Sequence, residues 1–184
     1  MGTLKQLLFY SGKTLLQHSI DEAADAGFCP IVVVVGSGAE EIRRLVSGAI
    51  QIVENKKWQT GMGSSIVAGM RALLNHSEPV SAVALLVADQ PLVKANHLSA
   101  MLGLLGADAE IVAAEYSGTV GVPALFTREW FEALLALSPE EGARTLLRGG
   151  STKIARFPLP EAAVDLDTRE DFENFTSAVQ SRRT

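Results

Sequence analysis

The sequence predicts an α/β fold, in which a mostly parallel, doubly wound sheet lies between two layers of helices. Short apolar runs rich in Val, Ile and Leu alternate with longer stretches whose apolar residues recur every three or four positions. Such alternation is typical of βαβ units, whose helices cover both faces of a parallel sheet. Glycines also stand where the predicted helices end or the strands turn, at Gly27, Gly36, Gly38 and Gly106. These are positions that favour unusual backbone angles.

The individual elements follow from this pattern. Strands are predicted at residues 30–35, 50–53, 80–88, 110–114, 122–126 and 153–157. Helices are predicted at residues 13–26, 39–47, 63–75, 95–105, 128–137, 140–147 and 169–179. No strand is predicted before the first helix, although a doubly wound domain usually opens with one. Because no shift in composition marks a boundary, residues 1–184 are predicted to form a single domain.

The composition narrows the functional classes. The chain is 47% hydrophobic and 20% charged, and its formal net charge is -5. A nucleic-acid-binding protein would normally carry a basic surface, so this acidic chain is not expected to bind nucleic acid. No apolar run is long enough to span a membrane, and the N-terminus lacks a signal-peptide pattern. The one cysteine, Cys29, cannot form an internal disulfide, which favours a cytoplasmic protein.

Residues 85–92, which read Leu-Leu-Val-Ala-Asp-Gln-Pro-Leu, carry the strongest functional signal. The apolar run is typical of a buried parallel strand, and Pro91 cannot continue such a strand. Asp89 is therefore predicted at the carboxyl end of a strand, where open α/β sheets bind their ligands. A carboxylate there could hold Mg²⁺ together with substrate phosphates. It could equally cap the turn or helix that follows.

Several pieces, in this order, resemble the molybdenum cofactor cytidylyltransferase group of the MobA-like nucleotidyltransferases. They are residues 1–8, 12–16, Asn55 with Trp58, and residues 61–65, 88–91, 121–126, 142–147 and 165–171. The resemblance covers essentially the whole chain and implies a nucleotide-diphospho-sugar-transferase-like fold. The family pattern begins with a strand and a Leu-Ala-Ala-Gly-x-Ser-x-Arg-Met-Gly loop, of which only Met1-Gly2 is matched. The domain at 1–184 is thus expected to lack the family's first strand and phosphate loop.

The resemblance implies a nucleotide site. Lys5 matches the family lysine that contacts the phosphates, where a fixed ammonium offsets the charge that builds up during transfer. Without the resemblance, it would be taken for a solvated lysine. The remaining nucleotide-binding candidates lie before or within a glycine- and serine-rich turn that could instead be only a helix cap; they are Asn55, Gly61, Gly63, Ser64 and Ser65.

The resemblance also implies a metal pair and an acceptor site. Asp89 and Asp167 are the expected Mg²⁺ ligands, with Asp165 as the weaker candidate, and Thr168 is expected to cap the last helix. Gly121, Pro123 and Arg144 are expected on the acceptor side. The family often has a histidine where this chain has Val122. An arginine can hold a phosphate through two hydrogen bonds, although a surface role for Arg144 is nearly as plausible.

The implied activity is that of a Mg²⁺-dependent enzyme, which transfers CMP from CTP to molybdopterin and releases pyrophosphate. A molybdoenzyme that receives the cofactor would be a further partner. Two alternatives remain: the same chemistry on another phosphorylated acceptor, or a non-catalytic module that binds a nucleotide or a pterin. The missing first strand adds a further expectation. The strands at residues 30–35 and 83–88 should not pair directly, but should be bridged by upstream residues or by a strand of a partner.

Overall fold

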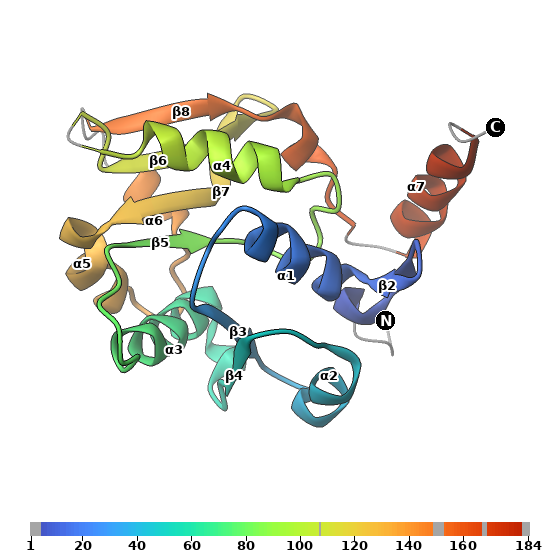
Figure 1. Ribbon diagram of the computed structural model, residues 1–184, viewed down its shortest axis with the longest axis horizontal. Coiled ribbons are helices and arrows are strands. Elements are labelled where there is room, and N and C mark those ends of the chain that lie inside the picture. The colour runs from blue at the N-terminus through green and yellow to red at the C-terminus, as the bar shows by residue number, and fades with distance from the viewer. Residues whose placement is uncertain (1–4, 107, 149–152, 167–168, 182–184) are drawn as a thin grey trace.

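A mixed sheet with helices on both faces forms the larger part of the computed structural model, which describes residues 5–106, 108–148, 153–166 and 169–181 (Figure 1). The strand order is β5-β7-β6-β8. Strands β5, β6 and β8 run in one direction, and β7 runs antiparallel to both of its neighbours. The strands are β5 (Ala82–Leu85), β6 (Ile111–Tyr116), β7 (Thr119–Thr127) and β8 (Ile154–Pro158).

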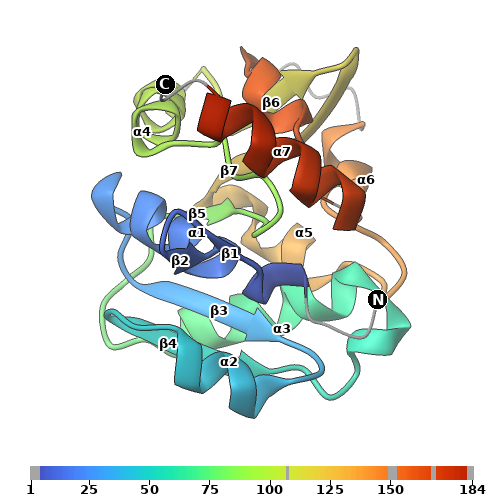
Figure 2. The same cartoon turned by 90° about the vertical axis from the view of Figure 1, so that its right-hand side faces the viewer.

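Alternating side chains of β6 and β7 build a core on each face of this sheet. Ile111 and Phe126 face helices α3 (Met62–Leu74), α5 (Phe131–Leu135) and α6 (Arg144–Leu147). Val112 and Leu125 face α4 (Ala95–Leu104) on the other side. Figure 2 shows α4 on one side of the strands and α5 and α6 on the other. This arrangement confirms the predicted three-layer α/β fold, because strands buried on both faces read as continuous apolar runs.

A second, parallel sheet pairs β3 (Ile31–Val35) with β4 (Ile50–Glu54). Its core includes residues from α1 (Leu15–Asp25) and α2 (Ala39–Leu45). Helix α3 approaches from the other side so closely that a Cβ on Gly69 would lie 3.0 Å from Val34. Among the described residues, β3 is paired with β4 and β5 with β7, and no pairing joins β3 to β5. Direct pairing of β3 with β5 would have contradicted the family fold. The strand that is expected to bridge them stays a prediction.

The N-terminal segment differs from the prediction. After a 3-10 turn, η1 (Lys5–Leu7), the chain forms a short hairpin of β1 (Phe9–Tyr10) and β2 (Lys13–Thr14), so a strand does precede the first helix. Helix α1 begins at Leu15 rather than at residue 13, because the Thr14 hydroxyl accepts a hydrogen bond from the Gln17 amide at 3.0 Å and caps the helix.

Four other boundaries differ from those predicted. Strand β5 covers only Ala82–Leu85, and β7 begins three residues before the predicted 122. The helix predicted at 128–137 is divided into the 3-10 turn η3 (Arg128–Trp130) and the short helix α5, and the helix predicted at 140–147 shrinks to α6. The last helix, α7 (Arg169–Ser181), packs through Phe175 onto Tyr10, with the ring centroids 4.9 Å apart. The chain is completed by the 3-10 turns η2 (Trp58–Thr60), η3 (Arg128–Trp130) and η4 (Pro160–Ala163). No helix in the described part is both long enough and apolar enough to cross a membrane.

An ion pair between β2 and α1 makes stability depend on pH. Although burial works to raise the pKa of Asp21, hydrogen bonds from Lys13 and Gln17 outweigh it and hold the pKa below its ordinary 3.8. A carboxyl whose pKa is lower in the folded state stabilises the fold above its unfolded pKa, and this contribution disappears as the pH falls through the folded pKa. Asp21→Asn should therefore lower the urea midpoint at neutral pH and much less in acid. An equal loss at both pH values, or a similar loss in the exposed control Asp108→Asn, would contradict this assignment.

Candidate active site

The predicted metal ligand Asp89 lies in a turn that follows the short strand β5 by four residues. Its side chain is half-buried, and its main-chain oxygen accepts a hydrogen bond from the Leu166 amide at 3.1 Å. The chain segment that leads to the second predicted ligand therefore meets the Asp89 turn. Asp167 itself lies outside the described residues, so the metal pair stays a prediction. Asp165, the weaker candidate, is exposed.

The described residues contain no group of three or more His, Cys, Asp or Glu side chains arranged to hold a metal ion. Mg²⁺ is usually bound by one or two carboxylates together with substrate phosphates and waters. Asp89, half-buried in the turn after β5, is the described carboxylate that the proposal assigns to this role.

Asn55 connects the end of β4 with the beginning of α3. It is buried, and its backbone amide donates to the Val35 carbonyl at 2.8 Å. Its side-chain nitrogen donates to the hydroxyls of Ser64 at 2.8 Å and Ser65 at 3.0 Å. Its side-chain oxygen accepts from the Lys57 amide at 2.9 Å. In this structure Asn55 therefore orients the two serines, and its own contact with a nucleotide stays a prediction.

The two serine hydroxyls are not equivalent. Ser64 Oγ donates its one hydrogen within the turn, to the Gly61 carbonyl at 2.8 Å or the Lys57 carbonyl at 3.1 Å. Ser65 Oγ accepts from Asn55, and within the described residues its own hydrogen has no acceptor. Ser65 can therefore donate to a ligand, whereas Ser64 is already engaged in the turn.

Gly61 and Gly63 are required by a neighbouring loop. A Cβ on Gly61 would lie 2.4 Å from the Pro139 carbonyl oxygen, and one on Gly63 would lie 2.1 Å from that of Ser138. Gly61 also has a φ of 123°, which disfavours other residues. The Gly63 amide donates to the Pro139 carbonyl at 3.0 Å. Both glycines were expected to bind the nucleotide. The structure gives them a packing role against this loop, and nucleotide contact stays a prediction.

The loop that covers these glycines is held by Glu141. The Ser138 hydroxyl and amide donate to its carboxylate at 2.6 and 3.0 Å, and these bonds lower the pKa of Glu141. The loop continues into α6, where the predicted acceptor ligand Arg144 is exposed and has no ion pair with another described residue. Lys5 begins η1, but its side chain lies outside the described part.

The predicted acceptor residues Gly121 and Pro123 lie in β7. A Cβ on Gly121 would lie 2.7 Å from the Tyr116 hydroxyl, so a larger residue here would require the Tyr116 side chain to shift. Between them, the Val122 carbonyl accepts a hydrogen bond from the Gln90 side chain at 3.1 Å. The structure thus joins the acceptor segment to the Asp89 turn through Gln90. Gln90 was not predicted to have a role. The signal that could have pointed to it is its place as a polar amide directly after an apolar run.

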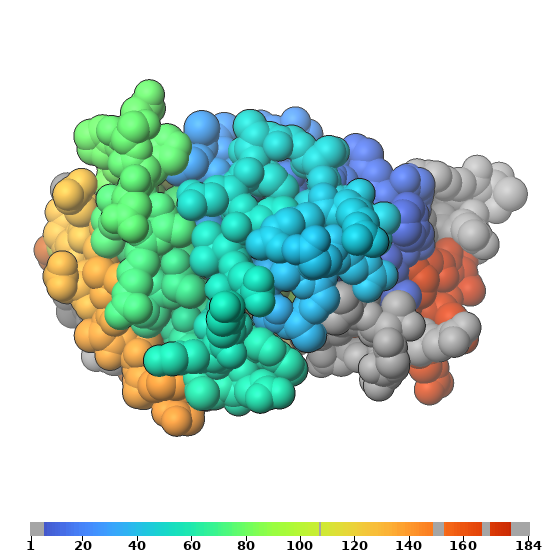
Figure 3. Space-filling model, turned by 90° about the horizontal axis from the view of Figure 1, so that it is seen from below, coloured from blue at the N-terminus to red at the C-terminus, as the bar shows by residue number. Residues whose placement is uncertain are grey.

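A groove of about 450 Å³ lies at the carboxyl ends of β3 and β4, between residues 36–40 and the side chains of Glu54, Lys56 and Trp58. Trp58 is 44% exposed and covers Gly36, where a Cβ would lie 2.6 Å from the indole ring. Helix α2 and the beginning of α3 are both visible on the face shown in Figure 3. The groove presents the aromatic ring of Trp58, three residues after Asn55 in sequence. The Asp89 turn is not among the residues that line it.

Solved structures with the same fold cover almost the whole chain. Rv0371c of Mycobacterium tuberculosis H37Rv in complex with manganese is 25% identical, with a TM-score of 0.75 over 94% of this chain and 91% of that one. Molybdopterin-guanine dinucleotide biosynthesis protein A of Archaeoglobus fulgidus is 13% identical, with a TM-score of 0.61 over 98% of this chain and 92% of that one. The second likeness, at this identity, concerns the fold alone.

Among curated relatives, the bifunctional protein GlmU of Ralstonia pickettii (strain 12J) is 34% identical over 98 residues. That match covers 53% of this chain, which spans only 21% of the length of GlmU. A match to the family described as the MobA-like NTP transferase domain extends over residues 1–156, most of the chain. This protein therefore belongs to the family of MobA-like NTP transferase domains.

Proposed function

We propose that this protein transfers a nucleotidyl group, with CMP from CTP favoured, to a molybdopterin-type acceptor and releases pyrophosphate. One observation carries the proposal most strongly. The turn that contains Asp89 is hydrogen-bonded both to the acceptor segment, at Val122, and to the segment that leads to Asp167, at Leu166. The three stretches that the reaction needs at one place are thus neighbours, within a domain that we assign to residues 1–184.

In the proposed reaction, an oxygen of the acceptor phosphate attacks the α-phosphorus of the nucleoside triphosphate. A P–O bond forms, and the bond to the β-phosphate breaks, so that pyrophosphate leaves with its electron pair. The nucleophile is already ionised at neutral pH, and no side chain has to remove a proton. The protein's contribution is to align the two phosphates and to stabilise the charge on them.

Each candidate side chain has a role in this proposal. Asp89 and Asp167 would hold Mg²⁺, which neutralises phosphate charge when bound. Lys5 would contact the nucleotide phosphates, and Arg144 would hold the acceptor phosphate. The nucleotide would lie along the beginning of α3, near Gly61 and Gly63, and receive a hydrogen bond from Ser65. The manganese complex of Rv0371c, a structural neighbour, supports the use of a divalent metal.

Pyrophosphate release by the full-length protein, measured with each of the four nucleoside triphosphates, tests this function. The assay is run with Mg²⁺, with and without molybdopterin. We expect release only when molybdopterin is present, and fastest with CTP. Faster release with GTP would keep the reaction class and change the base. Release that requires another phosphorylated acceptor would support the first alternative. Nucleotide or pterin binding without any release would favour a non-catalytic module.

Ser65→Ala should weaken nucleotide binding without unfolding the domain. A single neutral hydrogen bond contributes about 1 kcal/mol, which corresponds to a roughly fivefold rise in the dissociation constant. Titration calorimetry with CTP measures this change, and the thermal midpoint reports on the fold. Ser177→Ala, which removes a hydroxyl bonded to Glu173 on α7, is the matched control. An unchanged affinity in Ser65→Ala would contradict the assignment of this hydroxyl.

A further inference from the structure

The side chain of Gln90 is buried where three segments meet. It is only 5% exposed. Its amide nitrogen donates to the Ala162 carbonyl of η4 at 2.9 Å and to the Val122 carbonyl of β7 at 3.1 Å. The Tyr116 hydroxyl lies 3.5 Å from the same nitrogen. Both hydrogens of the amide are therefore used to hold two backbone carbonyls that are forty residues apart in sequence.

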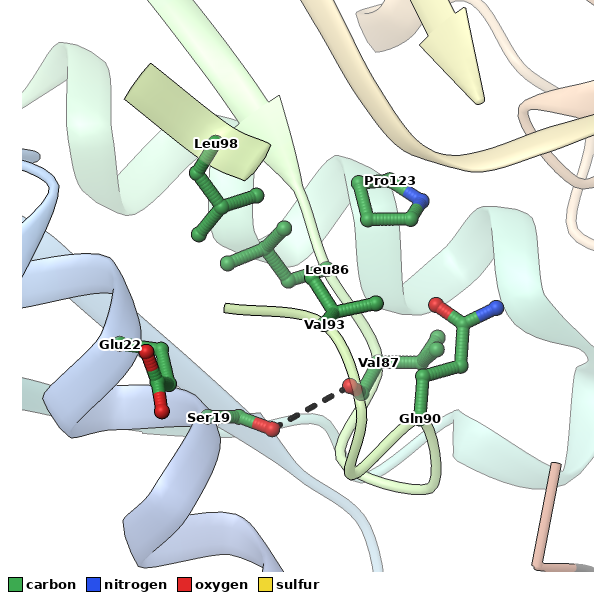
Figure 4. Close-up of a pocket in the computed structure, with 8 residues that line it drawn as sticks. All are labelled: Ser19, Glu22, Leu86, Val87, Gln90, Val93, Leu98 and Pro123. Atoms are coloured by element: carbon green, nitrogen blue, oxygen red, sulfur yellow. Dashed lines mark hydrogen bonds between the residues drawn. The ribbon is translucent and has the colours of Figure 1, made fainter. Parts of the chain in front are cut away.

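The orientation of this amide is determined by its partners. Two carbonyl oxygens face it, and each of them requires an N–H donor, so the amide cannot be turned around. Its oxygen instead points toward a small cavity of about 10 Å³, whose lining includes Leu86, Val87 and Pro123 (Figure 4). Among the described residues, this oxygen has no hydrogen-bond partner.

An apolar side chain of similar size, such as leucine, would leave the two carbonyls without their donor, which costs roughly 1–3 kcal/mol for a buried group. The amide is therefore explained by the two bonds that its nitrogen makes. Those bonds join segments that already contain candidate acceptor and metal residues.

The backbone next to Gln90 adds a third connection. The Asp89 carbonyl accepts from the Leu166 amide, four residues beyond Ala162. The Asp89–Gln90 turn thus holds the segment from Ala162 to Leu166 at both of its ends, and holds β7 at Val122. Any shift of the turn relative to one of these segments would break at least one of these bonds.

We propose that Gln90 is a positioning residue of the nucleotidyl-transfer site. Its amide sets the position of the Asp89 carboxylate relative to the acceptor segment and to the segment that leads to Asp167. The inference rests on the proposed function. Mg²⁺ needs nearly ideal octahedral geometry at about 2.0–2.1 Å, so a carboxylate displaced by a fraction of this distance binds the metal less well. A misplacement of about 1 Å at a reacting centre can reduce the rate on the order of 10²-fold.

The test compares Gln90→Leu, Gln90→Asn and wild type in the full-length protein. Leucine removes both donors, and asparagine keeps the amide but is one methylene shorter. Gln17→Leu is the matched control, because Gln17 is also a buried amide that donates to a backbone carbonyl, that of Ser47 at 3.1 Å, far from the Asp89 turn in sequence. For each protein, kcat, the KM for CTP, and the Mg²⁺ concentration that gives half of the maximal rate are measured.

We expect Gln90→Leu to lower kcat roughly 10–100-fold and to raise the half-maximal Mg²⁺ concentration by a similar factor, as for partners that orient metal ligands. The KM for CTP should change much less. Gln90→Asn should show the same pattern more weakly, and it decides the question if the leucine variant does not fold. Gln17→Leu should lower the thermal midpoint but leave the Mg²⁺ requirement unchanged, which separates positioning from loss of stability.

Two results would overturn the inference alone. The first is a wild-type Mg²⁺ requirement in both Gln90 variants, or in Gln90→Asn if Gln90→Leu does not fold. The second is a shift in Gln17→Leu as large as that in the Gln90 variants. In both cases wild type is active, and the proposed function stands. A wild-type protein that releases no pyrophosphate with any nucleotide would overturn the proposed function, and this inference with it.

Discussion

Replacing Asp89 by Asn should reduce kcat for pyrophosphate release roughly 10³-fold while the domain stays folded. A metal ion that stabilises developing charge contributes several kcal/mol, and each 1.4 kcal/mol or so corresponds to a factor of ten in rate. Asparagine has nearly the same shape, but it lacks the negative charge that binds Mg²⁺. The main-chain oxygen of residue 89, which accepts from Leu166, is unaffected by the change. Steady-state kinetics at saturating CTP measures the effect.

Asp108→Asn is the control for this variant, because Asp108 is an exposed carboxylate outside the candidate site. Its kcat should equal that of wild type. A folded Asp89→Asn enzyme with wild-type kcat would remove Asp89 from the metal site and would favour the turn-capping role that its position after a strand also allows.

Gly63→Ala should destabilise the domain, although alanine is the better helix former. In an open helix position, this exchange stabilises by about 0.8–1 kcal/mol. At Gly63, however, the new Cβ would lie 2.1 Å from the Ser138 carbonyl oxygen and 2.6 Å from that of Glu141. Both atoms are backbone and cannot rotate away, so the loop must move. Overpacking of this kind costs typically 1–3 kcal/mol, which exceeds the gain in helix propensity. Urea denaturation measures the net change.

Gly103→Ala provides the matched comparison within α4. A Cβ on Gly103 would meet nothing within 4 Å, so the full helix-propensity gain should appear as added stability. The two glycine variants are thus expected to have opposite signs. If Gly63→Ala is as stabilising as Gly103→Ala, then the loop at residues 138–141 does not pack on the beginning of α3 as the structure has it.

The sequence pattern was sufficient for the main strands and helices. The run of apolar residues at 30–35 became β3, and the three- and four-residue spacing at 63–75 became α3, each within one residue of the predicted limits. Both segments are long enough for their patterns to be recognised: a continuous apolar run for the buried strand, and three- and four-residue spacing for the helix. The same reasoning singled out Asp89, because it is a carboxylate that ends an apolar run, and its role as a metal ligand stays a prediction.

Short and irregular elements could not be found in this way. The two-residue strands β1 and β2 contain too few positions to show an alternation. Residues 140–143 have helical spacing, but in the structure this stretch forms a loop whose backbone lies against Gly61 and Gly63. That contact joins segments almost eighty residues apart, and local spacing carries no information about it.

The sequence by itself determined the fold class and which residue types are available for chemistry at the strand ends. Only the tertiary structure decided how they are used. It engaged the Ser64 hydroxyl within its own turn and left that of Ser65 able to donate to a ligand. It also directed the amide of Gln90 to carbonyls of β7 and η4. The physical reason is that a hydrogen bond depends on distance and direction, which for residues far apart in the chain are set by the packing of whole elements.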